Sequence, residues 1–388
     1  MRRPQVMNAE HWRDMVVQFR RDLHRIPELG FSEVKTSAYL RDRLAEMRLI
    51  ARPIAGTGLL ADIVGERGPG RTVALRADMD GLPVQEETTL SFPSEHAGVM
   101  HACGHDGHMA MVLAAALRLQ AARSDYRGTV RVLFQPSEER PPGGAVKMIA
   151  EGALDGVDEI YGLHVWSAQP TGTVELGEGP QMANDDEFTI RIYGRGGHGS
   201  EPESTRDAAL IAAQTVVNLQ TIVSRRVPAR RPVVVTCGTL AAGTAFNIIA
   251  ERAEITGTVR TYDDAMRARV ETELRNIAVR TAQMVGARAE VEYTHGYPAV
   301  VNHAAAVAKW RAALVAETEV AVRESEPKLA AEDFSYYLQK VPGAFMFVGA
   351  APTEGEPYPQ HSSHLEINED ALIVGTEALV RIALASLV

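Results

Sequence analysis

The sequence predicts an α/β protein in which a helix-covered sheet carries a second, smaller domain inserted into the chain. Probable helices alternate with short apolar strands along the first part of the 388-residue chain, which is typical of a sheet covered by helices. Near residue 185 the rhythm changes, because Phe188, Ile190 and Ile192 alternate with polar or amphipathic neighbours, as in a strand with one solvated face.

The larger domain begins with segments whose apolar periodicity predicts helices at residues 12–25, 33–47 and 109–122. Short apolar runs predict strands at residues 59–64, 72–76, 129–134 and 159–162. After Pro298 the chain returns to this pattern, with a helix at 304–319 and a strand at 344–349. Asn368 opens a final helix whose first turn contains Glu369 and Asp370.

The smaller domain follows the order βαββαβ. Its first strand, around Phe188, precedes a helix at 207–224, strands at 232–239 and 253–260, a helix at 263–285 and a strand at 288–293. This order is the ferredoxin-like split pattern. We therefore expect residues 1–183 and 297–388 to form the larger domain and residues 184–296 the inserted one, as the length of the chain also suggests.

The composition excludes several classes of protein. Acidic residues outnumber basic ones by 50 to 40, and no long lysine or arginine tract could follow a phosphate backbone, so nucleic acid is not an expected partner. No segment approaches the roughly 18 uncharged residues of a membrane span, so we expect a soluble, cytoplasmic protein without a membrane partner. Cys103 and Cys237 are too few for a disulfide scaffold.

The segment from His101 to His108 packs three imidazoles, a thiol and a carboxylate into eight positions before an apolar helix. A solvated helix N-terminus is the alternative explanation, and it would suffice for a single histidine. The density of the cluster favours a metal site. Thiolate and imidazole suit Zn²⁺ and are compatible with other first-row divalent ions, which makes Cys103 and His105 the first candidate ligands.

Two adjacent carboxylates, Glu138 and Glu139, follow the strand at 129–134. Open α/β sheets place their active sites at the carboxyl ends of the strands. Because neighbouring residues in a turn point in different directions, one carboxylate could bind a metal while the other faces a bound water. Taken alone, a pair of adjacent glutamates is usually exposed on the surface and has no catalytic role.

Other strand ends deliver further candidates to the same edge. His164 follows the strand at 159–162, the strand at 344–349 leads to His361, and Asp78 and Asp80 follow the strand at 72–76. A satisfied core histidine is the alternative for His164, and a turn cap is the alternative for the aspartates. Convergence at one sheet edge is the stronger argument for a site.

Ordered motifs spread over nearly the whole chain resemble the M20 family of metallopeptidases. The resemblance is specific for its amidohydrolase branch of hippurate hydrolases, N-acyl amino acid amidohydrolases and auxin-conjugate hydrolases. The motifs lie at residues 24–30 (HRIPELG), 75–83 (LRADMDGLP), 101–108 (HACGHDGH), 135–139 (QPSEE), 162–165 (GLHV), 196–199 (GGHG), 257–260 (GTVR) and 331–334 (AEDF).

The resemblance implies a catalytic domain with two divalent metal ions, whether Zn, Mn, Co or Ni. The ligand positions are matched by Cys103, His105, Glu139, His164 and His361. Glu138 matches the general base, and Asp80 matches the aspartate that orients a metal ligand. The implied reaction is cleavage of the amide bond of an N-acyl amino acid, such as hippurate, by metal-hydroxide attack.

The inserted domain is implied to act as a lid and dimerisation domain, in a homodimer or a dimer-based tetramer. His198 matches a histidine that reaches the partner's site and stabilises the oxyanion, whereas Asn247 and Arg260 match residues that hold the substrate's free carboxylate. A solvated loop and an exposed strand are the alternatives for His198 and Arg260. The chain departs from the family at Ser200–Glu203, where a Pro-His pair is usual, and at Ala250, where proline is usual.

Two other functions remain open at this point. One is an aminopeptidase or dipeptidase of the same fold, which would cut a dipeptide-like substrate and require a free α-amine. The other is a non-catalytic protein that binds metal or peptide. Glu138 argues against the second, because a pure binding site needs no base beside its ligands.

Overall fold

The computed structural model describes residues 9–315 and 320–388, and the chain divides into two compact units. Unit 1 comprises Met1–Gln181, Val301–Glu326 and Asp333–Val388, and unit 2 comprises Met182–Val300 and Pro327–Glu332. The predicted α/β class is confirmed. The last four residues of the helix expected at 304–319 lie outside the described residues.

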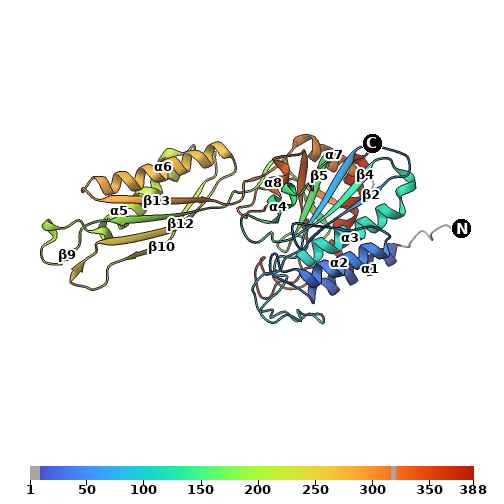
Figure 1. The fold of residues 1–388 in the computed structure, drawn as a ribbon, viewed down its shortest axis with the longest axis horizontal. Coiled ribbons are helices and arrows are strands. Elements are labelled where there is room, and N and C mark those ends of the chain that lie inside the picture. The colour runs from blue at the N-terminus through green and yellow to red at the C-terminus, as the bar shows by residue number, and fades with distance from the viewer. Residues whose placement is uncertain (1–8, 316–319) are drawn as a thin grey trace. The chain divides into compact units, whose positions relative to one another are not determined.

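Unit 1 is built on an eight-stranded mixed sheet (Figure 1). In spatial order its strands are β1 (Arg52–Ile54), β2 (Gly58–Val64), β4 (Thr129–Gln135), β3 (Thr72–Asp78), β5 (Glu159–Trp166), β16 (Gly343–Gly349), β6 (Thr173–Glu175) and β15 (Ala321–Arg323). The neighbouring strands β4, β3, β5 and β16 run parallel to one another. Their carboxyl ends therefore meet at one edge of the sheet.

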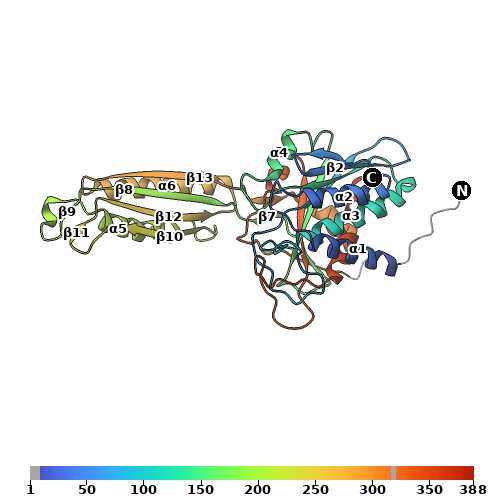
Figure 2. The ribbon, with the colours of Figure 1, turned by 60° about the horizontal axis from the view of Figure 1, so that its bottom comes forward.

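Seven α-helices of the described residues surround this sheet (Figures 1 and 2). They are α1 (Ala9–His24), α2 (Val34–Glu46), α3 (His105–Ala121), α4 (Gly144–Ala150), α7 (Ala304–Val315), α8 (Ser335–Leu338) and α9 (Asp370–Ser386). Successive strand residues point to opposite faces. Leu75 and Ala77 of β3 accordingly enter the main hydrophobic core with α3 and α9, while Arg76 between them pairs with Asp333.

Unit 2 contains the elements β8 (Asp186–Tyr193), α5 (Ala208–Thr221), β10 (Val234–Ala242), β12 (Arg252–Arg260), α6 (Asp264–Gln283) and β13 (Arg288–His295). They form an antiparallel sheet of order β10-β12-β8-β13, which is the ferredoxin-like order (Figure 2). Asp207 and Asp263 cap α5 and α6, since their carboxylates accept backbone hydrogen bonds of the first turns. Ile190 and Ile255 join the core of this unit.

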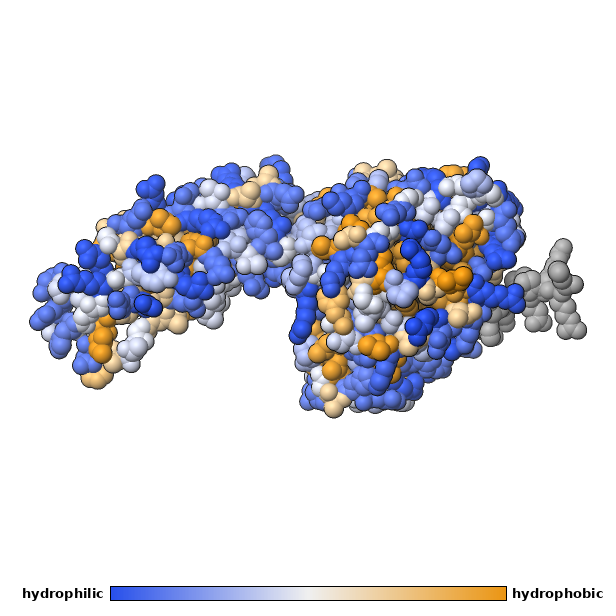
Figure 3. All heavy atoms as spheres, in the orientation of Figure 1, coloured by the Kyte–Doolittle hydropathy of each residue, from blue (hydrophilic) through white to orange (hydrophobic). Residues whose placement is uncertain are grey.

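The remaining elements are short. They are β7 (Gly179–Met182) paired with β14 (Val300–Asn302), β9 (Gly197–His198) paired with β11 (Ile248–Ile249), 3₁₀ turns at Arg123–Asp125 and Pro202–Ser204, and a π-turn at Ile222–Arg226. Polar side chains cover most of the face shown in Figure 3, with apolar groups in small patches. None of the helices in the described ranges is both long and apolar enough to cross a membrane.

Two elements differ from their predicted bounds in ways that affect the site. Helix α3 begins at His105 instead of Met109, because Gly104 adopts a left-handed conformation with φ of 97° at the N-cap. Strand β5 continues past Gly162 to Trp166, so His164 lies inside the strand. Gly162 does not end the strand. It is a glycine because the ring of Phe334 packs closely against its backbone, and a Cβ would lie only 2.8 Å from this ring.

Candidate metal centre

The predicted metal ligands of unit 1 are brought together at the carboxyl edge of its sheet. Strand β5 carries His164, β4 leads into Glu139, and the segment after β16 carries His361. The start of α3 supplies Cys103 and His105. Residues separated by up to 258 positions in the chain thus meet because their strands are parallel neighbours.

The donor atoms lie close enough to share metal ions. Cys103 Sγ lies 3.3 Å from His164 Nε2, and His361 Nε2 lies 3.3 Å from Glu139 Oε1. His105 Nε2 lies 3.8 Å from the same Glu139 oxygen. One group of mutually close ligand atoms joins His105 to Glu138 and Glu139. Two further groups consist only of predicted ligands, one of Cys103, His105 and His164 and one of Cys103, Glu139 and His361. Because Cys103 belongs to both groups, the arrangement suits two neighbouring ions.

A hydrogen bond orients His164, and a close carboxylate orients His105, so that each imidazole presents Nε2 to the cluster. His164 Nδ1–H donates to the carbonyl oxygen of Val165 over 2.6 Å, which leaves its Nε2 lone pair facing Cys103. His105 Nδ1 lies 3.4 Å from Asp80 Oδ1, while its Nε2 faces Glu139. Such outer partners are what select the tautomer of a metal-binding histidine.

The electrostatics of the cluster favour a bound cation. Burial raises the pKa of the Cys103 thiol well above its usual value, and the charges of Glu139 and Glu138 raise it further. Burial lowers the pKa of His105, but the carboxylates of Asp78, Asp80 and Glu139 outweigh this effect and bring the pKa to about 10. The raised pKa of His105 reports a negative potential, which a divalent ion would neutralise.

Buried polar atoms without partners support the same conclusion. Both ring nitrogens of His105 and Glu139 Oε1 are buried and have no hydrogen-bond partner of proper geometry. Such atoms are rare in folded proteins because each costs free energy, and an ion is one way to satisfy them. The donor set of thiolate, imidazole and carboxylate therefore fits first-row divalent metals.

His108 supports the centre without being free to bind metal. Its Nδ1–H donates to Asp78 Oδ1 over 2.7 Å, and its Nε2 accepts the backbone N–H of Val165 at 2.9 Å. Both ring nitrogens are therefore occupied, although Asp78, His105 and His108 also lie close enough to form a ligand group. Since Val165 follows His164, the His108 imidazole fixes the strand that carries a candidate ligand.

A second supporting network contains Arg76 and Gln135, whose roles the sequence did not predict. Buried Arg76 donates to Asp78 over 2.7 Å, to Gln135 over 2.9 Å and to Asp333 over 2.9 Å. The amide of Gln135 also donates to Asp333. An arginine in the middle of an apolar strand was the available signal, because a buried guanidinium requires carboxylate partners.

Asp80 connects the metal ligands to the candidate base. Its Oδ1 and Oδ2 accept the backbone N–H groups of Glu138 and Glu139 at 2.9 and 3.1 Å, and Oδ1 also faces His105. Glu138 itself is buried, and its Oε2 lies 4.0 Å from His105 Nε2. One aspartate thus orients a histidine and fixes the two-glutamate turn.

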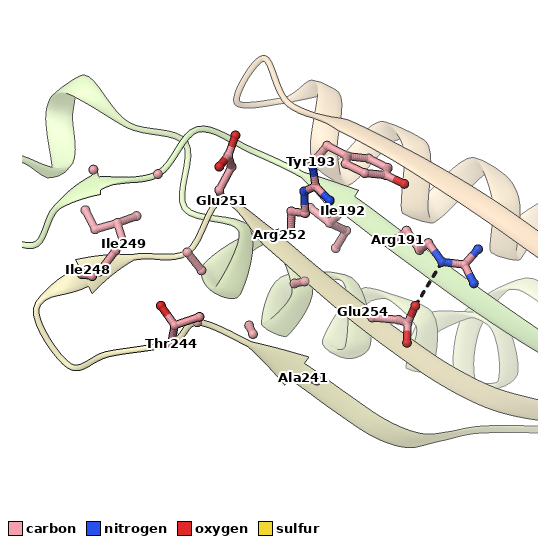
Figure 4. Close-up of a pocket in the computed structure, with 16 residues that line it drawn as sticks. Arg191, Ile192, Tyr193, Ala241, Thr244, Ile248, Ile249, Glu251, Arg252 and Glu254 are labelled. Atoms are coloured by element: carbon pink, nitrogen blue, oxygen red, sulfur yellow. Dashed lines mark hydrogen bonds and ion pairs between the residues drawn. The ribbon is translucent and has the colours of Figure 1, made fainter.

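The remaining predicted site residues lie in unit 2. His198 is exposed on β9, where its Nδ1 lies 2.7 Å from Ser200 Oγ, and Asn247 is exposed before β11. Arg260 pairs with Asp185 over 2.8 Å. A pocket of about 790 Å³ lies beside the β9–β11 ribbon. Figure 4 draws the residues that line it, among them Ile248 and Glu251. It is a feature of unit 2 alone.

Comparison with known proteins decides the family. Residues 74–385 match the model of peptidase family M20/M25/M40. The chain belongs to this family. The geometry of unit 1 is consequently that of an M20 hydrolase, and the resemblance drawn from the motifs is confirmed.

Individual relatives cover about three quarters of the chain or more. The chain is 45% identical to an N-acyl-L-amino acid amidohydrolase of Geobacillus stearothermophilus over 290 residues, or 74% of this chain and 78% of the relative. It is 40% identical to thermostable carboxypeptidase 1 of Saccharolobus solfataricus, covering 94% and 93%. A crystal structure of the Bacillus subtilis YXEP protein, described as a dinuclear metal binding M20 peptidase, aligns with a TM-score of 0.87, 35% identity and coverage of 98% and 99%.

Proposed function

We propose that this M20 hydrolase cleaves the amide bond of N-acyl amino acids, with a dinuclear metal centre held by Cys103, His105, Glu139, His164 and His361. The observation that carries the proposal is the close approach of these five side chains around a buried base, Glu138. The similarity to an N-acyl-L-amino acid amidohydrolase supports this substrate class.

Glu138 is the proton carrier in the proposed reaction. Bound divalent ions would lower the pKa of water and polarise the amide carbonyl. Glu138 removes a proton from the attacking water as the new carbon–oxygen bond forms. It then transfers this proton to the amide nitrogen, the carbon–nitrogen bond breaks, and the products are a carboxylic acid and the free amino acid. Asp80 holds the turn at Glu138 and the His105 imidazole in place during these steps.

Three residues of unit 2 are proposed to recognise the substrate. Arg260 and Asn247 would hold its free carboxylate, since a guanidinium fork matches a carboxylate in geometry and charge. Arg260 already forms an ion pair with Asp185, so the substrate carboxylate must replace Asp185 as its partner. His198, exposed on its short strand, would stabilise the oxyanion in the site of a second subunit.

A dimer formed through unit 2 is part of this proposal. Helix α5 exposes Leu210 and Val217, which are seven residues apart and thus on one helical face. The neighbouring edge strand β10 exposes Leu240. Edge strands and apolar helix faces left open within one unit favour pairing with another chain.

The proposal is tested by reconstituting metal-free protein with Zn²⁺, Mn²⁺ or Co²⁺ and measuring hydrolysis of a panel of N-acetyl and N-benzoyl amino acids. We expect turnover with at least one metal and a preference for substrates with a free α-carboxylate over their methyl esters. Absence of hydrolysis with every metal and substrate would overturn the proposal.

A carboxypeptidase is the second candidate, because the chain is also similar to a thermostable carboxypeptidase. A peptide and an N-acyl amino acid both place an amide bond beside a free carboxylate, so Arg260 would serve either. N-acetyl amino acids and N-acetyl dipeptides with the same C-terminal residue separate the candidates. Faster release of this residue from the dipeptides would favour the carboxypeptidase over the acylase.

A further inference from the structure

The turn that carries Glu138 and Glu139 has an unfavourable backbone conformation. Ser137, directly before the two glutamates, has a φ of +51°. Residues with a Cβ adopt this left-handed region at a cost, because the Cβ approaches the following carbonyl oxygen. Contacts from outside the turn must therefore hold it in place, or the direction of both glutamate side chains would be lost.

Two buried carboxylates supply these contacts by accepting three successive backbone N–H groups. Asp80 accepts those of Glu138 and Glu139. The third, that of Ser137, donates to Glu33 Oε1 over 2.8 Å. Glu33 is fully buried, with an exposed fraction of 0%, and its other oxygen accepts the hydroxyl of Thr57 at 2.5 Å.

The position of Glu33 in its own helix gives no other reason for a glutamate. Glu33 occupies the N-cap of α2, where serine, threonine, aspartate and asparagine are preferred. Its side chain makes no capping hydrogen bond. The side chain instead leaves the helix and reaches the turn that follows β4, 104 positions later in the chain.

The segment before Glu33 is shaped to let the turn approach. A Cβ added at Gly30 would lie 2.5 Å from Ser137 Oγ, so only glycine fits there without displacement. Behind the turn, the N–H of Gly144 donates to the carbonyl oxygen of Ser137 over 2.8 Å. Ser137 is thus enclosed by Gly30, Glu33 and Gly144.

We propose that Glu33 is a positioning residue of the metal centre, which fixes the Ser137 turn so that Glu139 meets the metal and Glu138 meets the water. Its effect on turnover rests on the proposed function, whereas its effect on metal binding does not. Glu33 touches neither substrate nor metal and acts only through the backbone of the turn.

Two substitutions at Glu33 test its hydrogen bond to Ser137. Glutamine keeps a carbonyl oxygen that accepts the Ser137 N–H, and methionine of similar size does not. The pair Glu33→Gln and Glu33→Met therefore separates the hydrogen bond from the volume of the side chain.

Glu28 offers a matched control from the same segment. Its carboxylate accepts the backbone N–H of Thr36 at 3.0 Å and so stabilises α2 instead of the turn. Glu28→Met removes a half-buried carboxylate acceptor next to the same helix. Any general destabilisation of α2 should appear in this variant as well.

The first measurement is Co²⁺ binding to metal-free protein, followed by absorption. We expect the Co²⁺ dissociation constant to rise about 10-fold in Glu33→Met, as is usual when a partner of a metal ligand is removed, and less than about 2-fold in Glu33→Gln and Glu28→Met. The second is hydrolysis of an N-acyl amino acid, where we expect kcat of Glu33→Met to fall about 10- to 100-fold with little change in KM.

Wild-type Co²⁺ affinity and kcat in Glu33→Met, or equal losses in Glu28→Met, would overturn the positioning role. Equal losses in Glu33→Gln would overturn it too, since the acceptor is retained. If Glu33→Met does not fold, Glu33→Ala provides the same test. If the wild-type protein hydrolyses none of the amides, the proposed function fails, and the Co²⁺ measurement alone decides the role of Glu33.

Discussion

At the scale of single residues, the candidate metal centre concentrates acidic side chains around Cys103 and His105. Burial, and then the charges of Glu139 and Glu138, raise the pKa of Cys103. The carboxylates near His105 outweigh burial and raise its pKa, and His105 has no hydrogen-bond partner of proper geometry. A divalent ion relieves both conditions, because it binds thiolate and neutral imidazole. The chemistry of individual side chains therefore makes testable predictions about metal content.

Cys103→Ala should lose most of its bound metal, since Cys103 belongs to both ligand groups. Cys237→Ala is the matched control, because Cys237 lies on β10 of unit 2 and belongs to neither group. Elemental analysis of the purified proteins measures metal per chain. Full occupancy in Cys103→Ala would remove this cysteine from the proposed centre.

Glu138→Gln should keep its metal and lose turnover by about 100-fold or more, because glutamine is isosteric but cannot accept the water proton. The comparison variant is Glu139→Gln, which should lose metal as well, since Glu139 faces His361. Metal content and kcat are measured on the same samples. Near wild-type turnover in Glu138→Gln would show that another group is the base.

The lowered pKa of Glu86 predicts how the free energy of unfolding depends on pH. Burial raises its pKa, but hydrogen bonds from His24, Thr88 and Ser94 outweigh burial and bring the pKa to about 2. A carboxylate with a lowered folded pKa stabilises the fold above its unfolded pKa, and this contribution disappears as pH falls towards the folded value.

Between about pH 4.5 and pH 2, thermal unfolding of Glu86→Gln should therefore depend less on pH than that of the wild type. Above this window the wild type should be the more stable protein. Glu354→Gln, at an exposed loop position, controls for the loss of one surface charge. Parallel curves for the wild type and Glu86→Gln would contradict the prediction.

At the scale of elements, the start of α3 depends on one backbone conformation. Gly104 has a φ of 97°, and a Cβ there would lie 2.4 Å from Val165 Cγ2 of β5. Gly104 is the N-cap of α3, so Cys103 comes directly before it in the chain and His105 is the first residue of the helix. The glycine therefore couples the beginning of a helix to the strand that holds His164.

Gly104→Ala should lower the free energy of unfolding by about 3 kcal/mol, from left-handed strain and overpacking together. Gly156→Ala is the control: Gly156 has a φ of 72° but no atom within 4 Å of its added Cβ, so only the strain of about 1 to 2 kcal/mol applies. Denaturant unfolding measures both. Equal losses would show that the contact with Val165 is easily relieved.

At the scale of the whole molecule, the proposed assembly depends on apolar groups of unit 2. Leu210 and Val217 of α5 are 56% and 68% exposed, which is unfavourable in water unless another surface covers them. If His198 completes the site of a second subunit, separation of the subunits should also abolish turnover.

The double variant Leu210→Glu with Val217→Glu should be monomeric by light scattering and should lose hydrolysis by about 100-fold, the size expected for a lost oxyanion donor. Ile50→Glu is the control, because Ile50 is 86% exposed in unit 1 and the change also replaces an exposed apolar side chain by a carboxylate, with one added charge against two in the double variant. A monomeric wild type, or a fully active monomeric variant, would contradict the assembly.

The sequence by itself determined the α/β class and the identity of the family. Periodicity sets which faces of helices and strands are buried, and parallel strands necessarily bring their carboxyl ends together. For this reason Glu139, His164 and His361 could be assigned to one edge before their positions were known. Family motifs could also distinguish Glu138 from Glu139, which spacing alone does not.

Only the tertiary structure decided which atoms of the candidate residues are available to bind a metal ion. His105 and His108 occupy neighbouring turns of one helix, yet both nitrogens of His108 form hydrogen bonds, with Asp78 and Val165, whereas those of His105 form none of proper geometry. Glu33 reaches Ser137 across 104 positions, with no local pattern to indicate it. Tertiary packing determines which distant segments form hydrogen bonds with each other. The hydrophobic periodicity of the sequence does not predict these partners, because it depends only on residues that are close along the chain.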